Sequence, residues 1–597
     1  MRCGFKAPLR FLCVLVGITA TTQAQLSILD KEVDKSTGSE VEVVSVFDKL
    51  PPTGFAPLRV TVRNRSGQDL AWRFESLSTA SRYRGEHTAS GRFAMDVPAG
   101  SSRTGTFLAP VATNYGNIGY SGDASLQVTA INRSMGTHSS SEYAERPESF
   151  PSLAMSKPLA AATLTKLEDQ LETKMSASSR HGSGQRVFAS RFDPQQLPED
   201  WLGYSGLDFL LMRPADWEVL NPGQRRAILQ WVRLGGGLHL YKVGKAELKD
   251  LGIPDVQGTK VDRSQGELAM FEWSGKDLPS AEVVNRYWGK PHRLMLVRES
   301  YSGKGFHLHT ALGERSFAAW QVLVFLAIFG VLVGPINLFV LAPPGKRHKL
   351  FFTTPILSIG ASVAMIGLIL LQDGTGGEGR RMITVELRPE EALAYVSQEQ
   401  VSRTGVLTST GFTLKQPALI QALALPDSQW TKLTYSSDSQ STDLQLDGLE
   451  VAGLLFQSRT EQAQLLQTPV STRARVELKL GSGPGDPPTI VSALGFAAET
   501  LYYIDPAGEV WKAPGVVGSG SEVTLDKSTS KAWSEWHRGL LDIGGPKTSS
   551  HLKSGSRSNR GQFYALAKAA PDFIQPTLPS IRWKDDQVVV FGPVKQL

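Results

Sequence analysis

The stretch AAWQVLVFLAIFGVLVGPINLFVL, from Ala318 to Leu341, and the stretch FFTTPILSIGASVAMIGLILL, from Phe351 to Leu371, decide the architecture of this chain. Neither stretch contains a charged residue. Each exceeds the ~20 residues that an α-helix needs to cross the hydrocarbon core of a membrane, whereas buried core helices show apolar runs of about 10–14 residues. The two stretches therefore predict a hairpin of transmembrane helices over 318–341 and 351–371.

The short loop between the two apolar stretches, 342–350, carries Lys346, Arg347 and Lys349. Short loops rich in lysine and arginine stay in the cytoplasm. We therefore expect these three residues to determine the topology, with the large regions on either side of the hairpin outside the cytoplasm.

Small residues recur at a spacing of four within both apolar stretches. Gly330 and Gly334 form a GxxxG pattern in the first, and Gly360 and Ala364 repeat the small-xxx-small spacing in the second. Small side chains let two helical backbones approach closely in a membrane. This spacing predicts that the two helices pack against each other through these four residues.

The first apolar stretch also contains Pro335 and Asn337. A proline inside a helix removes one backbone hydrogen bond and kinks the helix. Two interpretations of Asn337 follow: a polar contact for a partner helix or a transported species, or a side chain that satisfies the backbone freed by the kink. The second interpretation is the simpler one, because a lone amide differs from the ionisable residues that mark permeation paths.

The N-terminal segment 1–24 has the three parts of a secretory signal. Arg2, Lys6 and Arg10 form a basic region, and an apolar run of ten residues, from Phe11 to Ala20, follows. Such a run is too short to span a bilayer. We expect cleavage before Gln25 and export of the chain.

The charge and cysteine content narrow the range of functions. Of the 597 residues 63 are Lys or Arg and 57 are Asp or Glu, which gives a net charge of +6, and the signal and the hairpin loop account for this excess. No nucleic-acid partner is therefore expected. Both cysteines, Cys3 and Cys13, lie in the signal. The mature chain would have no disulfide, thiolate metal site or cysteine nucleophile, which favours a bacterial envelope protein over an animal ectodomain.

The first exported region, 25–133, reads as a β-sandwich of the immunoglobulin-like kind. Leu58, Val60 and Val62 alternate with polar residues, and Trp72 and Phe74 flank an arginine. Alternation with a period of two predicts strands with one buried face. The serine-rich segment 134–151 reads as a linker.

The next region, 152–315, reads as an α/β domain with a parallel sheet. Leu207–Met212 and Leu238–Val243 are apolar runs typical of buried parallel strands. Between them, Asn221 begins a helix with a capping box and Gly235–Gly237 ends it. Strand, helix and strand form a right-handed βαβ unit.

The region after the hairpin, 382–597, reads as mainly β and extracytoplasmic. Leu501–Lys512 is predicted to be a hairpin of two strands, and Val588–Phe591 a buried strand. Lys531–Ile543 is predicted to be an amphipathic helix carrying Trp533 and Trp536. Lys547–Arg560, rich in Ser, Lys and Gly, is predicted to be a mobile loop.

The sequence contains no Walker A, HExxH, GxSxG or EF-hand motif. His307 and His309, two apart in an expected strand, would share a face and begin a metal site, but no third ligand lies nearby, and a structural role is the simpler interpretation.

Gly235–Gly237 is either an anion-binding turn or a helix C-cap, and the C-cap is favoured. Asp585 and Asp586 are either paired carboxylates or an acidic surface turn, and the turn is favoured. Trp231, Trp533 and Trp536 either stack on sugars or belong to the core, and the core is favoured.

Two segments resemble a known group of proteins. Leu197–Tyr241, LPEDWLGYSGLDFLLMRPADWEVLNPGQRRAILQWVRLGGGLHLY, is similar to the class I glutamine amidotransferase-like domain of uncharacterised bacterial membrane proteins. Val331–Gly367 resembles the two-helix hairpin of the same proteins, which are often encoded with MoxR-type ATPases and von Willebrand factor A proteins. The resemblance implies a catalytically degenerate domain, because the mature chain lacks the cysteine nucleophile of true amidotransferases.

The combined expectation is a non-catalytic, membrane-anchored scaffold or binding protein of the bacterial inner membrane, with protein partners in the envelope. No catalytic, cofactor-binding or metal-binding residue is assigned. The alternatives are an unrecognised envelope hydrolase and a sensor of carbohydrates or peptides. His239 is the histidine nearest the βαβ unit, and its alternation with Leu238 and Leu240 predicts a packed side chain.

Overall fold

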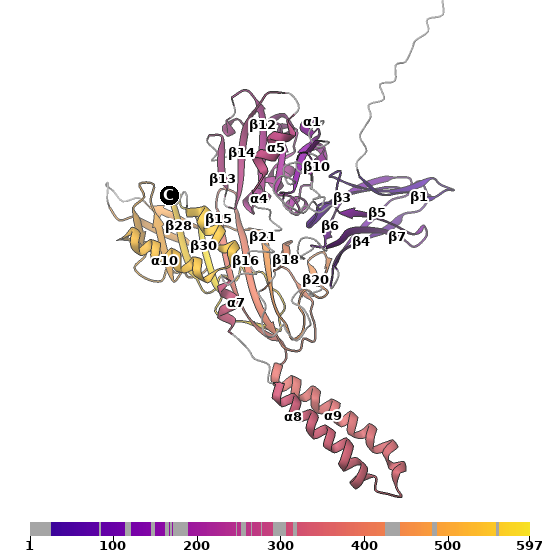
Figure 1. Ribbon diagram of the computed structural model, residues 1–597. Coiled ribbons are helices and arrows are strands. Elements are labelled where there is room, and N and C mark those ends of the chain that lie inside the picture. The colour runs from indigo at the N-terminus through magenta and orange to yellow at the C-terminus, as the bar shows by residue number, and fades with distance from the viewer. Residues whose placement is uncertain are drawn as a thin grey trace, which may run out of the picture.

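The computed structural model describes residues 26–82, 85–113, 121–144, 150–160, 166–167, 170, 189–245, 247–251, 253, 258–263, 265–275, 278–290, 306–313, 319–423, 425, 442–479, 486–556 and 560–596. The predicted signal, 1–24, lies outside them. The described chain is mostly β and forms several sheets, from which two helices project together at one end (Figure 1).

The N-terminal region forms two antiparallel sheets packed face to face. One has the order β1-β2-β3-β6, and the other contains β5-β4-β7-β8. The strand bounds are β1 Ser27–Asp34, β2 Ser39–Ser45, β3 Gly54–Arg63, β4 Leu70–Arg82, β5 Gly85–Val97, β6 Ser102–Val111, β7 Ser121–Asn132 and β8 Gly136–Ala144.

The alternation that predicted this sandwich corresponds to its buried face. Leu58, Val60 and Val62 of β3 are fully buried, and Trp72 and Phe74 of β4 join them in one apolar core between the two sheets. Two packed antiparallel sheets with one apolar core form a β-sandwich. The prediction of two antiparallel sheets packed as a β-sandwich is therefore confirmed.

The expected linker over 134–151 is wrong where the structure describes it. Residues Gly136–Ala144 form β8, which pairs with β7 along nine residue pairs, from Ala124–Ala144 to Asn132–Gly136. β8 is an edge strand whose described side chains are at most half-buried. Such a strand can be rich in serine because its side chains need not enter a core.

The next unit contains a mostly parallel sheet with the order β10-β9-β11-β12-β14-β13, in which β13 alone of the described strands is antiparallel. The main-chain elements are β9 Leu153–Ser156, α1 Lys157–Ala160, β10 Ala189–Phe192, β11 Phe209–Met212, α3 Pro214–Glu218, α4 Pro222–Arg233, β12 Gly237–Val243, β13 Lys260–Arg263, β14 Gly266–Trp273 and α5 Ser280–Tyr287. Short 3₁₀ turns occupy Pro194–Gln196, Trp201–Tyr204 and Leu248–Leu251.

The βαβ unit within this sheet has the predicted local structure. Asn221 and Gln224 form a reciprocal capping box at the start of α4. At its end, Gly235 adopts a φ of 114°, and the amide of Gly236 donates to the carbonyl of Trp231 at 3.0 Å. This is a Schellman end, so Gly235–Gly237 is a helix C-cap.

The expected α/β domain, 152–315, extends too far along the chain. Its last described element is α5, whereas α7 (His307–Leu312) packs on the sheet formed by the C-terminal region, where Leu308 is buried. The reason is the apolar side of this short helix, which completes a core made by residues from beyond the hairpin.

The two projecting helices are long and apolar enough to cross a membrane. The candidate spans are Trp320–Leu341 and Arg347–Asp373. In the most apolar 18 residues of each span only 6% and 0% of the residues are buried, so the spans are not core helices of the body. The first consists of α8 (Ala319–Val331) and a π-helical segment (Leu332–Leu341) that contains Pro335, and the second is α9 (Leu350–Asp373), preceded by a 3₁₀ turn over Arg347–Lys349. The backbone irregularity that Pro335 predicted is thus a π-helix.

The C-terminal region forms a large sheet of ten described strands that packs on a smaller sheet of four. The large sheet contains β15 Gly377–Arg388, β16 Leu393–Thr404, β18 Leu419–Leu423, β21 Glu461–Ser471, β24 Thr500–Ile504, β25 Val510–Lys512, β27 Asp526–Ser528, β28 Gln562–Ala567, β29 Ile581–Trp583 and β30 Gln587–Pro593. The smaller sheet contains β22 Arg475–Lys479, β23 Thr489–Ala493, β26 Glu522–Thr524 and β31 Lys595–Gln596. The predicted hairpin over Leu501–Lys512 corresponds to β24 and β25.

Three strands from the C-terminal region extend a sheet of the N-terminal sandwich: β17 (Phe412–Thr413), β19 (Thr442–Asp447) and β20 (Glu450–Ala452). β19 lies parallel to β5, with Thr442 opposite His87 and Leu446 opposite Gly91. The region 382–597 is therefore not a separate domain, because it completes a sheet that begins before the hairpin.

The expected mobile loop over Lys547–Arg560 is wrong where it is described. Pro546–Ser556 form helix α11, which follows α10 (Ser530–Ile543) and covers the large sheet (Figure 1). The carboxylate of Glu399 accepts the amides of Gly545 and Lys547 at 2.9 and 2.8 Å. A distant residue thus caps this helix, which the local sequence does not reveal.

Candidate functional site

The carboxyl ends of the parallel strands are where α/β folds place ligands. Here the hydroxyl of Ser156, at the end of β9, donates to Asp216 Oδ2 at 2.7 Å, and Arg213 forms an ion pair with Asp216 at 2.8 Å. Burial would raise the pKa of Asp216, but hydrogen bonds from Arg213 and Ser156 lower it. Both oxygens of Asp216 are engaged, and no described histidine bonds to Ser156, so this group holds α3 in place without activating the serine.

A longer polar network surrounds His239 on β12. Its Nε2 lies 2.6 Å from Glu267 Oε1, and its Nδ1 lies 2.5 Å from the hydroxyl of Tyr287. Lys260 and Lys290 contact the same carboxylate at 2.7 and 2.6 Å. The network therefore joins a phenol, an imidazole, a carboxylate and two ammonium groups.

The charges in this network follow from its burial. Burial lowers the pKa of His239 to about 4, so the imidazole is neutral at neutral pH. Burial opposes ionisation of Glu267, but hydrogen bonds from His239, Lys260 and Lys290 hold its pKa well below its usual range. An ionised carboxylate only accepts, so Nε2 of His239 carries the proton and Nδ1 accepts from Tyr287.

The same network has the order of a catalytic triad, with Tyr287 in the place of the nucleophile. Tyr287 and His239 are fully buried, however, and burial raises the pKa of Tyr287 well above its usual value. Glu267 and His239 also lie at the start of their strands, opposite the edge where α/β folds bind ligands. The packed side chain predicted for His239 is confirmed, and we regard the network as a structural one.

A second buried charged cluster joins the α/β unit to the large sheet. Arg233, at the end of α4, contacts Glu391 at 2.8 Å and Glu386 at 3.6 Å. Burial would raise the pKa of Glu386, but Arg388, His551 and Arg233 hold it well below its usual range. The cluster fixes the two units against each other, and nothing in the sequence near any one of its members indicated it.

The prediction that His307 and His309 lie on a strand is wrong. They belong to α7, where residues two apart point in different directions. Nε2 of His309 lies 3.0 Å from Glu461 Oε2. Within the described residues no group of three potential ligands could hold a metal ion.

The remaining sequence candidates take structural places. Trp231 is fully buried and Trp533 is nearly so, whereas Trp536 is partly buried beside it. Asp585 and Asp586 lie in a turn after β29 and contact Arg380 and Arg381 at 2.8 and 2.6 Å. The core and surface-turn interpretations are therefore confirmed for these residues.

The packing predicted for the small residues of the hairpin is wrong. A Cβ added at Gly330, Gly334 or Gly360 would meet no atom within 4 Å, and Ala364 is exposed. The small residues lie away from the contact between the helices because polar pairs align the hairpin on another face. Nδ2 of Asn337 donates to Thr354 Oγ1 at 2.9 Å, and Gln372 bonds to Gln321.

The side chain of Asn337 therefore makes a polar contact with the neighbouring helix α9, which agrees with the partner-helix form of the first interpretation. It does not satisfy the backbone freed by Pro335, since its Oδ1 has no hydrogen-bond partner among the described residues. It is 1% exposed and is the buried polar residue of the described π-helical segment. The basic residues Lys346, Arg347 and Lys349 are exposed at the tip of the hairpin, farthest from the body.

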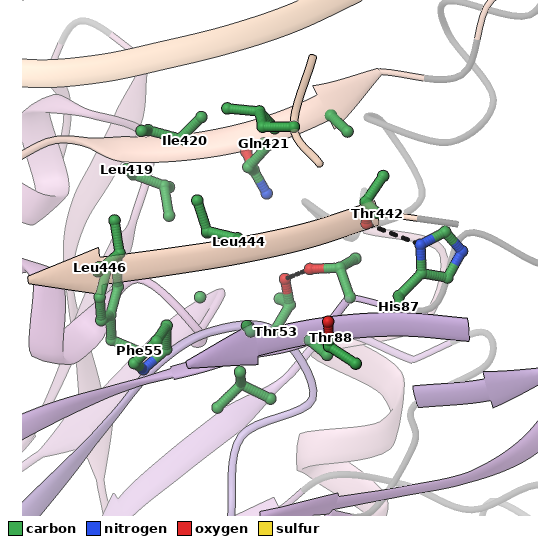
Figure 2. A pocket seen from close by; sticks show the side chains of 18 of the residues that line it. Thr53, Phe55, His87, Thr88, Leu419, Ile420, Gln421, Thr442, Leu444 and Leu446 are labelled. Carbon is green, nitrogen blue, oxygen red and sulfur yellow. Dashed lines mark hydrogen bonds between the residues drawn. The ribbon is translucent and has the colours of Figure 1, made fainter. Parts of the chain in front are cut away.

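A small pocket lies where β18 and β19 meet β3, β5 and β6 (Figure 2). Its volume is about 40 Å³. The polar contacts of its lining residues include one hydroxyl pair, Thr53 with Thr113 at 2.6 Å, and one histidine–hydroxyl pair, His87 with Thr442 at 2.8 Å. A space of this size holds a few water molecules. Sequence analysis missed it because its walls come from both sides of the hairpin.

No protein-family model matches this chain, and no curated protein matches it. Among solved structures, Spo0M, a sporulation control protein from Bacillus subtilis, shares 16% identity over 22% of this chain and 55% of its own, with a TM-score of 0.15. A β-glucuronidase from Bacteroides uniformis shares 8% identity over 42% of this chain and 39% of its own, with a TM-score of 0.19. The yeast delta-COP-I mu-homology domain shares 6% identity over 37% of this chain and 95% of its own, with a TM-score of 0.16.

Proposed function

We propose that this protein is a non-catalytic scaffold or binding component of a bacterial envelope, anchored in the inner membrane by its hairpin. The observation that carries the proposal is the interlocking of the two regions that flank the hairpin. β19 extends the sheet of β5, and Arg233 is paired with Glu391. Both regions must therefore lie on the same side of any membrane that the hairpin crosses, as a rigid body on one anchor.

The side of the membrane follows from the predicted signal and the basic loop. Lys346, Arg347 and Lys349 favour a cytoplasmic tip of the hairpin under the positive-inside rule, which supports an extracytoplasmic body. The resemblance to bacterial two-helix membrane proteins with a degenerate amidotransferase-like domain agrees with this arrangement. Protein partners in the envelope are the ligands that we propose for the body.

The absence of catalysis is proposed from how the titratable groups are used. The serine and carboxylate at the carboxyl ends of the parallel strands are occupied by each other and by Arg213. The imidazole of His239 and the phenol of Tyr287 are fully buried. A nucleophile and a base must both reach a substrate, and these described groups do not.

The topology is tested with single cysteines, because both native cysteines lie in the predicted signal. We expect Lys31→Cys and Lys568→Cys to react with a membrane-impermeant maleimide in spheroplasts, and Lys346→Cys to react only after detergent is added. The three lysines are all exposed, so accessibility within the protein is matched. Labelling of Lys346→Cys in intact spheroplasts would contradict the proposed orientation.

The function is tested on the purified full-length protein. We expect no glutaminase or esterase turnover above background, and we expect the chain crosslinked in native membranes to form a discrete complex larger than itself. Hydrolysis that disappears in Ser156→Ala or His239→Gln would promote the hydrolase alternative. A chain that remains monomeric under crosslinking would argue against a scaffold.

A further inference from the structure

A larger pocket opens at the end of the large sheet that is farthest from the hairpin. Its volume is about 370 Å³, and three pieces of chain form it: the turn between β15 and β16, the segment that joins β21 to β22, and the end of β30 with β31. Pockets that bind small molecules have volumes of about 300–1,000 Å³. The pocket is therefore large enough for a small ligand.

Positive charge gathers in this pocket. Arg473, Arg475 and Lys595 line it together with one carboxylate, Glu390. Arg475 is already paired with Glu477 at 2.6 Å. Arg473 and Lys595 are exposed, and within the described part of the chain their side chains have no carboxylate partner. Two cations thus remain available for a ligand.

The turn on one side of the pocket has an unusual backbone. Ala392 has a φ of 51°, in the left-handed region, which is strained for a residue with a Cβ. Its carbonyl accepts the amide of Thr472 at 3.0 Å, which ties this turn to the segment that carries Arg473. Strained backbone held by its surroundings recurs at ligand clamps, and here it fixes one wall of the pocket.

We infer that this pocket binds an oxyanion, a phosphate or carboxylate group of a soluble small molecule. The guanidinium of Arg473 offers a planar fork that suits either group, and the ammonium of Lys595 adds a second charge from β31, the strand that pairs with β22. The site is independent of the proposed scaffold function, because it uses none of the residues that join the parts of the body.

The position of the pocket excludes the headgroups of the anchoring membrane as the source of the anion. β15 begins at Gly377, close to the end of α9 at Asp373, and runs for 12 residues to Arg388 beside the pocket. Twelve strand residues span about 40 Å, which is far beyond the reach of a side chain. A soluble ligand is therefore the one that fits.

The experiment is isothermal titration of the full-length protein in detergent at constant ionic strength, with pyrophosphate and citrate as the two probes. We expect saturable binding of at least one probe, weakened about tenfold or more in Arg473→Gln/Lys595→Gln, because the double variant removes two charge-assisted contacts. The control is Lys531→Gln/Arg538→Gln, which removes two exposed cations from α10. We expect it to bind as the parent does.

Binding of pyrophosphate alone assigns a phosphate ligand, and binding of citrate alone assigns a carboxylate ligand. The proposal is overturned if neither probe binds saturably or if the two double variants lose the same affinity, since that result would mean attraction by net charge only. Equal unfolding midpoints of both variants and the parent verify that the exposed substitutions leave the fold intact.

Discussion

The parallel sheet of the α/β unit and the large C-terminal sheet bury different kinds of side chain. β11 buries Leu210 in the core on one face of the sheet and Leu211 in the core on the other face. β16 of the large sheet buries Ser397, Gln398, Glu399 and Gln400 completely. Apolar burial is non-directional, whereas a buried polar group needs its own partner. The parallel sheet is therefore stabilised by the area it buries, and the large sheet by specific contacts with the rest of the chain.

Those contacts hold the body in one arrangement. The α/β unit supplies Arg233 to the carboxylates of the large sheet, and Gln467 of β21 contacts Leu234 of the α/β unit at 3.4 Å. α11 is held by Glu399. A different placement of either element would leave charged or amide groups buried without partners, which costs more than the loss of apolar contact.

The largest effect is expected where the two sheets meet. Arg233→Ala leaves the buried Glu386 and the half-buried Glu391 beside one cation fewer, and the loss of a buried ion-pair partner costs about 3–5 kcal/mol. Urea unfolding of the full-length protein in detergent measures this change. The matched control is Arg226→Ala, an exposed arginine on the same helix, which we expect to change stability by less than about 0.5 kcal/mol. If both substitutions lowered the stability equally, the contact of Arg233 with the large sheet would not be a specific source of stability.

The second effect concerns the capping of α11. Glu399→Ala leaves the amides of Gly545, Lys547 and Thr548 buried without their acceptor, and we expect a loss of about 3 kcal/mol, as for other buried polar groups deprived of a partner. Hydrogen exchange should accelerate in Pro546–Ser556 and leave β11 unchanged. Glu399→Gln keeps one acceptor and should recover part of the loss. Uniform exchange in all variants would show that α11 is held by apolar contacts instead.

These two effects also mark the limit of prediction from the sequence. The βαβ unit was predicted closely, because its capping box, its Schellman end and its apolar runs are all local signals. The strand β16 carries no such signal, since its polar residues are buried by segments far away in the sequence. α11 was predicted to be a loop for the same reason, because the distant Glu399 caps it. The serine-rich β8 was predicted to be a linker because an edge strand with little buried surface shows no apolar alternation. Among candidate sites, the packing of His239 could be predicted, but its partners Tyr287 and Glu267 could not.

The third effect is a pH dependence that both sheets contribute to. Burial lowers the pKa of His239 to about 4 and also lowers that of His551, so the unfolded chain binds more protons below its histidine pKa of about 6.5. The stability they contribute is complete above pH ~6.5 and is lost as the pH falls towards 4, by up to about 3 kcal/mol for His239. Unfolding measured between pH 7.5 and 4.5 should show a smaller slope in His239→Gln. An unchanged slope would mean that folding does not shift the pKa of this histidine.

The smallest effects compare the two sheets with one kind of substitution. Leu210→Met in the parallel sheet conserves volume and polarity, and we expect it to cost less than about 1.5 kcal/mol. Gln467→Met is similar in shape, but it removes the donor that reaches Leu234, Gln265 and Ser397 at 3.3–3.4 Å. We expect Gln467→Met to lower the free energy of unfolding by about 1–3 kcal/mol, because its acceptors lose their donor. Urea unfolding of both variants under the same conditions measures the difference directly. If Gln467→Met costs no more than Leu210→Met, the polar residues of the large sheet are fillers of volume, and the specificity of the body must come from the charged contacts of Arg233 and Glu399 alone.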